Sequence, residues 1–208
     1  AACTRAAARS EANRPDMDEI ALFPLNTVLF PGGLLPLRIF ETRYVDMVGG
    51  CMRQEAAFGV VLIVDGNDTG SAVSIAEVGT SARIVDFQTE ADGLLGLLCR
   101  GERRFRVAQR RRQGDGLYRA TVEWMHDAPL TPLDPQFQPL VSVLRNVMTP
   151  LANIGRFIEP NYQDASWVSH RLAELLPLEA PWRQRLLEID DPNVRLGLLA
   201  PLIETGRI

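Results

Sequence analysis

The chain has 208 residues, of which 46% are hydrophobic and 23% are charged, and its formal net charge is −4. These proportions are ordinary for a globular protein, and a chain of this length can bury about 70% of its unfolded surface without a disulfide or metal. The acidic balance argues against nucleic acid as the main partner, because phosphate binding needs a local excess of cations.

All 22 basic residues are arginine, and no lysine occurs in the chain. A P-loop nucleotide site needs a lysine on the phosphates, and a Ser–Lys peptidase dyad or a Schiff-base mechanism needs one as well. These three chemistries are therefore excluded, and with them any ATPase or Ser–Lys peptidase activity of this chain. We expect that the protein is not an enzyme.

The cysteines Cys3, Cys51 and Cys99 are odd in number and far apart, so neither a disulfide framework nor a metal site is indicated. Cys51 and Cys99 lie in apolar runs and are expected to be small core residues. This pattern predicts a cytoplasmic protein without a cofactor. No apolar run approaches the ~20 residues of a membrane-spanning helix, so we expect no membrane partner.

Residues 1–16 are rich in Ala and Arg and are predicted to form an N-terminal tail. The stretch 20–44, IALFPLNTVLFPGGLLPLRIFETRY, is strongly apolar and is repeatedly interrupted by Pro and Gly. It predicts two buried strands, over 19–23 and 34–40, joined by a rigid connection. Proline withholds a backbone donor, so Pro36 indicates an edge strand or a bulge.

A helical pattern follows over 41–54, with its apolar residues on one face. The continuous apolar run over 58–64 is typical of a central strand. Strand-like segments then follow over 73–78 and 80–87, on either side of Gly79.

Two hairpins are predicted next. Asp92-Gly93 is a hairpin signal that leads into the apolar run 94–99. The strand pattern continues over 103–112 and returns over 117–125 after a glycine-rich turn.

Alternation with a period of two divides the side chains of the 103–112 segment between two faces. We expect Phe105 and Val107 to be buried, and Arg104 and Arg106 to be largely exposed on an edge hairpin. A nucleic-acid stripe along Arg104–Arg112 is the alternative, although nearby aromatic stacking partners are missing.

The segment 126–135, HDAPLTPLDP, holds three prolines and marks the best boundary in the chain. It predicts a β-rich subdomain over 17–128 and a helical subdomain over 129–208. Helices are expected over 137–148, from Asp164 or Ser166 to 176, from 181 to about 189, and after Asp191. Trp167 and Trp182 lie within these helices and are expected to anchor them on the β subdomain.

The pieces LFPL, VLFPG and LPLRIFETRY, in this order and spacing, resemble the opening of the Lon protease N-terminal domain. This substrate-binding domain is also found as a stand-alone protein in bacteria. A Gly-Thr step, the Asp-Gly turn and the C-terminal run LAELLPLEAPWRQRLLEIDDPNVRLGLLAPLIE agree with the same family in the same order. The resemblance extends over about residues 20–204 and is weakest over 150–163.

The resemblance implies an α+β fold, in which a PUA-like pseudo-barrel with one inserted helix is followed by a C-terminal helical bundle. It implies a non-catalytic protein that binds unfolded or extended polypeptide segments. An adaptor role beside a separate protease or chaperone, and an oligomeric state, are left open. The alternative function is RNA binding through the barrel, because PUA-like barrels elsewhere bind RNA.

Candidate polypeptide-binding residues lie where a strand passes into a helix, and they are Arg38, Phe40, Glu41, Arg43 and Tyr44. The alternative is that both aromatic residues pack in the core and the charges solvate the helix start. A binding groove is expected beside this segment, where the helices meet the barrel.

No catalytic or metal-binding residue is predicted. The two histidines, His126 and His170, belong to no zinc-binding pattern. His170 lies near Ser166 and Ser169, but neighbours within one helix rarely form a catalytic triad, and no nucleophile-elbow motif is present.

Overall fold

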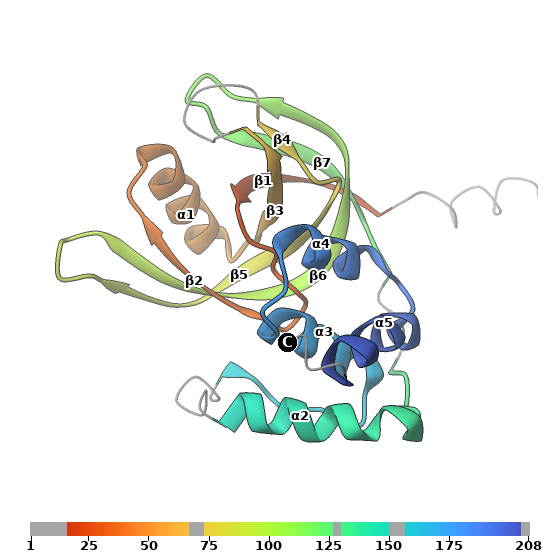
Figure 1. The fold of residues 1–208 in the computed structure, drawn as a ribbon. Helices are drawn as coiled ribbons and strands as arrows, with labels where there is room; N and C mark the ends of the chain where they lie inside the picture. Colours follow the sequence, from red (N-terminus) through yellow and green to blue (C-terminus); the bar gives the residue numbers. More distant parts are fainter. Residues whose placement is uncertain (1–15, 67–72, 127–129, 150–156, 205–208) are drawn as a thin grey trace, which may run out of the picture.

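The computed structural model of the chain describes residues 16–66, 73–126, 130–149 and 157–204. The α+β prediction is confirmed, since a β-rich half with α1 inserted between β2 and β3 precedes a helical half (Figure 1). The strands are β1 Met17–Leu25, β2 Leu34–Ile39, β3 Phe58–Asp65, β4 Ser74–Ile75, β5 Val78–Thr89, β6 Leu95–Arg112 and β7 Tyr118–Trp124. The helices are α1 Thr42–Gln54, α2 Gln138–Met148, α3 Ala165–Leu175, α4 Ala180–Glu188 and α5 Pro192–Glu204, and a 3-10 turn, Pro135–Phe137, precedes α2.

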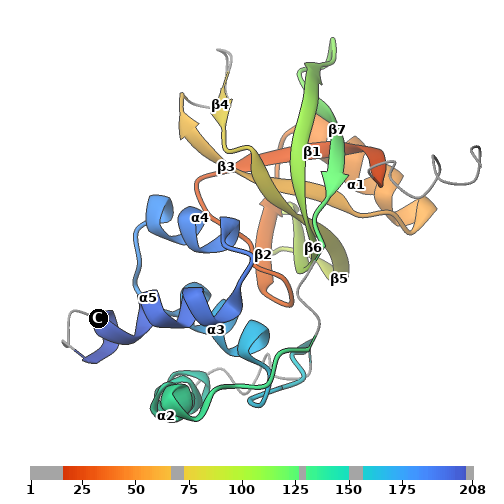
Figure 2. The ribbon, with the colours of Figure 1, turned by 90° about the vertical axis from the view of Figure 1, so that its right-hand side faces the viewer.

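Five strands form a barrel in the order β1-β7-β6-β5-β3, and β1 closes it by pairing with β3. The closing pair is parallel, whereas the other pairs of this barrel are antiparallel. This topology is compatible with a PUA-like pseudo-barrel. Helices α2 to α5 gather on one side of the barrel, and α1 lies away from α2 (Figures 1 and 2).

Strand β6 is long enough to serve two parts of the molecule. Residues 105–112 pair with β7 inside the barrel, whereas residues 95–100 pair with β2. Strand β5 pairs with β3 over 80–82 and follows β6 much further. The first part of β6, the last part of β5 and β2 therefore form a three-stranded extension of the barrel, which lies beside α1 (Figure 1).

The Asp92-Gly93 hairpin is confirmed and shapes the tip of this extension. Gly93 has φ +83°, a conformation that glycine adopts at no steric cost. The Gly93 N–H donates to the Glu90 carbonyl at 2.9 Å, and the Glu90 N–H donates to the Leu94 carbonyl at 2.8 Å. The turn fixes the register between β5 and β6.

Glycines bring the β1–β2 connection directly onto β6. The Gly32 N–H donates to the Gly101 carbonyl, and the Gly101 N–H donates to the Gly33 carbonyl, both at 2.8 Å. A Cβ at Gly101 would lie 2.3 Å from the Phe30 carbonyl oxygen, so a side chain is excluded there. This crossing sets the position at which β2 begins.

Helix α1 covers one face of the extension with the apolar side that the sequence predicts. Tyr44, Met47 and Val48 are buried there, together with Cys99 of β6. Burial raises the pKa of the Cys99 thiol to about 12, and Cys51 of α1 is half-buried. Both cysteines therefore serve as packing residues, as expected.

A second core joins the helices to the barrel. Its buried members include Phe30, Leu62 and Val78 of the barrel half and Leu172 and Leu187 of α3 and α4. Gln184 of α4 adds a buried hydrogen bond at 3.0 Å to the Val78 carbonyl.

The tryptophans contribute less to this junction than expected. Trp167 is half-buried and packs edge-on against Tyr162, with ring centroids 5.1 Å apart. The expectation that Trp182 anchors its helix is wrong, because α4 turns this ring to solvent, where the Arg185 guanidinium lies over it.

Of the two β6 arginines that were predicted to be exposed, Arg106 is exposed and Arg104 is not. Phe105 is buried, Val107 is half-buried and Arg106 is exposed, but Arg104 is only 1% exposed. The physical reason is that the helical half covers the face of β6 that alternation assigned to solvent. Nor does this part of β6 lie at an edge, because it pairs with both β5 and β7.

Arg104 closes the C-terminal end of α4. Its Nη1 donates to the carbonyls of Leu187 at 2.9 Å and Ile189 at 3.2 Å, and its Nη2 donates to Asp190 at 3.0 Å. Arg195 of α5 donates to the Ile189 carbonyl as well. The last carbonyls of a helix lack intrahelical partners, so these two guanidinium groups satisfy groups that would otherwise be buried unpaired.

Candidate functional site

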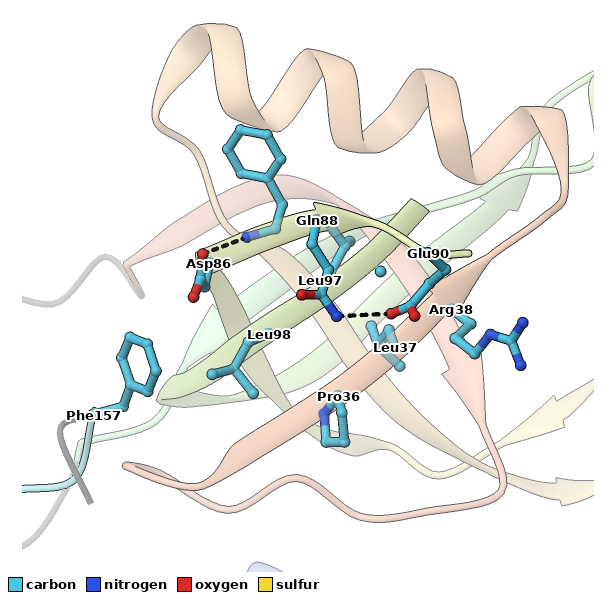
Figure 3. Close-up of a pocket in the computed structure, with 11 residues that line it drawn as sticks. Pro36, Leu37, Arg38, Asp86, Gln88, Glu90, Leu97, Leu98 and Phe157 are labelled. Carbon is cyan, nitrogen blue, oxygen red and sulfur yellow. Dashed lines mark hydrogen bonds between the residues drawn. The ribbon is translucent and has the colours of Figure 1, made fainter. Parts of the chain in front are cut away.

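A pocket of about 550 Å³ lies on the extension, on side chains of β2, β5 and β6. Phe157, from the segment before α3, stands at one end of it (Figure 3). The volume is within the usual range for ligand pockets. This pocket lies beside Arg38 of the predicted site, and it is formed by three strands with Phe157 from the helical half, while the expected groove between helices and barrel stays a prediction.

Strand register places two cross-strand rows of residues on the pocket face, Pro36–Leu98–Asp86 and Arg38–Gly96–Gln88. Directly opposed residues share one face of a sheet, and the two rows are about 7 Å apart because they are two residues apart along each strand. The first row has an apolar centre. The second row is hollow at its centre, because Gly96 has no side chain.

Glu90 occupies the hollow above Gly96. A Cβ at Gly96 would lie 2.3 Å from Glu90 Oε1, so the carboxylate lies against the backbone of β6. Gln88 Nε2 donates to the same oxygen at 3.0 Å (Figure 3). Within the described residues no arginine pairs with Glu90, since the neighbouring Arg38 forms its ion pair with Asp92.

The other end of the pocket is apolar. Leu98 and Phe157 are half-buried, and Pro36 is exposed beside Leu98. Asp86 lies at the rim, where its Oδ1 accepts the N–H of Phe87 at 2.9 Å. The pocket therefore combines an apolar end with a carboxylate end.

The predicted site residues separate into two groups. Arg38 lines the pocket, and Phe40 is 72% exposed just after β2 but does not line the pocket. Tyr44 is buried and stacks on Phe23, with ring centroids 4.0 Å apart.

Arg43 and Glu41 fasten α1 to the barrel. Arg43 is buried, donates to the Gly116 carbonyl at 2.9 Å, and pairs with Glu41 at 2.7 Å. Its guanidinium carbon lies 4.7 Å from the centre of the Tyr44 ring. These three residues contact one another and not the pocket, and a binding role for the five-residue set stays a prediction.

The pocket contains residues that sequence reasoning missed. Glu90 and Gly96 belong to the β5–β6 hairpin, and the Asp92-Gly93 turn could have revealed their opposition once its register was counted. Phe157 lies in the segment where the family resemblance is weakest, and no local pattern indicates its place.

The exposed arginines of β6 and its neighbours are largely neutralised. Arg103 pairs with Asp16, Arg106 with Glu77, and both Arg111 and Arg119 with Glu19. Arg111 and Arg119 accordingly hold the pKa of Glu19 below its ordinary value. Because Arg104 is buried as well, the RNA-binding alternative gains no support from this face.

The serines near His170 do not form a hydrolase site with it. Ser169 Oγ accepts a hydrogen bond from Arg195 at 2.7 Å and donates to the Ser166 carbonyl at 3.0 Å. Burial and the charges of Arg195 and Arg171 hold the pKa of His170 well below 6.5. Across the described ranges, no three His, Cys, Asp or Glu side chains are grouped to hold a metal ion. Among the described helices, none has the length and hydrophobicity to cross a membrane.

Comparison with known proteins gives a consistent result. The family model of the ATP-dependent protease La (LON) substrate-binding domain matches residues 19–205. The chain belongs to this family. A Lon N-terminal domain protein from Xanthomonas campestris is 40% identical, with a TM-score of 0.75, over 88% of this chain and 98% of that one.

Two full Lon proteases are also similar. The Cytophaga hutchinsonii protein is 24% identical over 187 residues, which are 86% of this chain and 23% of that protein. The Anaeromyxobacter dehalogenans protein is 30% identical over 209 residues, which are 94% of this chain and 24% of that protein. This chain thus spans less than a quarter of either Lon protease, and the match concerns the substrate-binding domain.

Proposed function

We propose that this chain binds unfolded or extended polypeptide segments in the pocket of the β2–β6–β5 extension, without catalysing a reaction on them. The observation that carries the proposal is the pocket itself, which lies across a sheet that ends on both sides. Among the described strands, β2 pairs with β6, and β5 pairs beyond residue 82 with β6 alone. The outer edges of β2 and of the last part of β5 are thus open among the described strands, so an extended chain that lies along β6 has an open strand edge on either side.

The chemistry of the pocket suits a polypeptide. Leu98, Pro36 and Phe157 offer apolar surface to the side chains of a bound segment, and the Glu90 carboxylate lies above Gly96. Burial of one apolar side chain stabilises a complex by about 1.5–3 kcal/mol, so a bound segment needs several such contacts to offset the cost of association. Membership of a family described as a substrate-binding domain supports the same proposal.

The biological setting is part of the proposal. The chain would deliver bound segments to a separate protease or chaperone, as an adaptor in the cytoplasm. Neither that partner nor an oligomeric state is required for the pocket to bind.

A direct binding assay tests the proposal. The probe is a fluorescently labelled globular protein kept unfolded by reduction and carbamidomethylation, and the readout is fluorescence anisotropy. We expect binding to the unfolded probe and none to its native form. Leu98→Asp should weaken the complex, whereas Val64→Asp, at an exposed position of β3 outside the pocket, should not. Equal affinity of both variants, or no binding by the parent, would contradict the proposal.

A further inference from the structure

We propose that the pocket selects segments in which an arginine or lysine lies two residues away from an apolar residue. This inference rests on the proposed function and adds a substrate class to it. It is carried by the two ends of the pocket, which differ in chemistry and are separated by a fixed distance.

The carboxylate end supplies the attraction for a basic side chain. Glu90 lies on the floor of the pocket, and its one hydrogen-bond donor among the described side chains is the neutral amide of Gln88. Among the described lining residues the one arginine is Arg38, and it forms an ion pair with Asp92 in the hairpin turn. The lining is thus electrostatically complementary to a cation.

The spacing of the two ends matches an extended chain. The apolar row is centred on Leu98 and the hollow row on Gly96, two residues apart along β6. Side chains at positions i and i+2 of an extended segment point the same way and are also about 7 Å apart. A segment that runs along β6 can therefore place its apolar side chain on Leu98 and its basic side chain over Glu90, in either chain direction.

A basic residue next to the apolar one would fail this geometry, because neighbouring side chains of an extended segment point to opposite faces. An acidic residue at the second position would approach Glu90 with like charge. Charge and spacing thus make two separate demands on the ligand.

Short labelled peptides test both demands. Ten-residue Gly/Ser peptides would carry Leu-Ser-Arg, Arg-Ser-Leu, Leu-Ser-Glu or Leu-Arg-Ser, and their affinities would be measured by anisotropy at low salt. We expect the first two to bind about fivefold more tightly than the others, in keeping with a partly exposed ion pair. The preference over Leu-Ser-Glu should shrink as salt is raised.

Variants of the protein assign the preference to the carboxylate. Glu90→Gln keeps the size of the side chain and should abolish the preference for Arg over Glu. Asp46→Asn removes an exposed charge from α1, outside the pocket, and should leave the preference intact.

The failures of the two proposals are distinguishable. If the unfolded probe binds through Leu98 but the four peptides bind equally well, or if Glu90→Gln keeps the preference, the selectivity proposal is wrong and the binding function stands. If neither the peptides nor the unfolded probe binds, the proposed function itself is wrong.

Discussion

Replacement of Arg104 by methionine should separate the roles of burial and charge at the junction between barrel and helices. Methionine retains most of the apolar stem, so the cavity contribution is small. The two hydrogen bonds from the guanidinium to the carbonyls of Leu187 and Ile189 are lost. Each charged hydrogen bond contributes about 1.5 kcal/mol or more, and the Ile189 carbonyl keeps its bond from Arg195, so the free energy of unfolding should fall by about 2 kcal/mol.

The ion pair with Asp190 adds little to this figure, because the Asp190 side chain is 75% exposed. Loss of the buried guanidinium also removes its own desolvation cost, which argues against a larger effect. Asp190→Asn should therefore lower the free energy of unfolding by less than about 1 kcal/mol.

Urea denaturation followed by circular dichroism measures these differences. The matched control is Arg106→Met, two residues along β6, where the arginine is exposed and pairs with Glu77 at 3.4 Å. We expect that variant to lose less than about 0.5 kcal/mol. If Arg104→Met and Arg106→Met were equally stable, the carbonyls of α4 would not depend on Arg104, and the reasoning would be refuted.

Two further predictions concern His170 and the glycines. The pKa of His170 is lowered in the folded chain by burial and by Arg195, Arg171 and Arg104. Below about pH 6.5 the unfolded chain therefore takes up a proton that the folded chain does not. The free energy of unfolding should be highest above that pH and should fall as the pH is lowered towards the folded-state pKa. The loss should reach at most about 1.4 kcal/mol per pH unit and be absent from His170→Phe; parallel pH profiles of the two proteins would contradict it. Gly50→Ala should stabilise the chain by up to about 1 kcal/mol, because the helical position is open, whereas Gly101→Ala should destabilise it, because the new Cβ would meet the backbone of the β1–β2 connection. Thermal unfolding of the Gly50→Ala and Gly101→Ala variants measures both effects, and melting temperatures that shift in the same direction would contradict this reasoning.

Local chemistry accounts for the parts of the fold that the sequence predicts well. Asp92-Gly93 marks its hairpin because few other pairs adopt the required turn. Pro36 indicates an edge strand because proline has no backbone N–H to donate to a second neighbouring strand. Among the described strands, β2 pairs with β6 alone.

Tertiary packing accounts for the parts that the sequence does not predict. Alternation correctly placed Arg104 and Phe105 on opposite faces, but it could not show that α4 and α5 cover the second face. Two separate strand segments were expected on either side of Gly79, yet β5 runs through it. The missing side chain leaves room for the Phe105 ring and the Val60 carbonyl, so this glycine serves close packing within the strand.

Tertiary packing also decides which of the candidate binding residues reach the pocket. Arg43 and Tyr44 were candidates for a binding surface, with core packing of Tyr44 as the stated alternative, and α1 turns both residues towards the barrel. The pocket instead depends on which residues oppose one another across three strands, and on Phe157, which approaches from a distant part of the chain.

The division of β6 into two parts implies that stability and binding can be altered separately. Residues 95–100 form the floor of the pocket. Arg104, only about four residues further along the same strand, donates to the carbonyls at the end of α4. The Gly101 crossing lies between them and ties β6 to the start of β2 through backbone hydrogen bonds that neither site shares. Loss of the Arg104 contacts should therefore loosen the helices while the register of Leu98 and Gly96 is retained. Peptide affinity of folded Arg104→Met should stay within about twofold of the parent, since sites without shared partners behave nearly additively. A large loss of affinity in that variant would mean that the helical half shapes the pocket through more than Phe157.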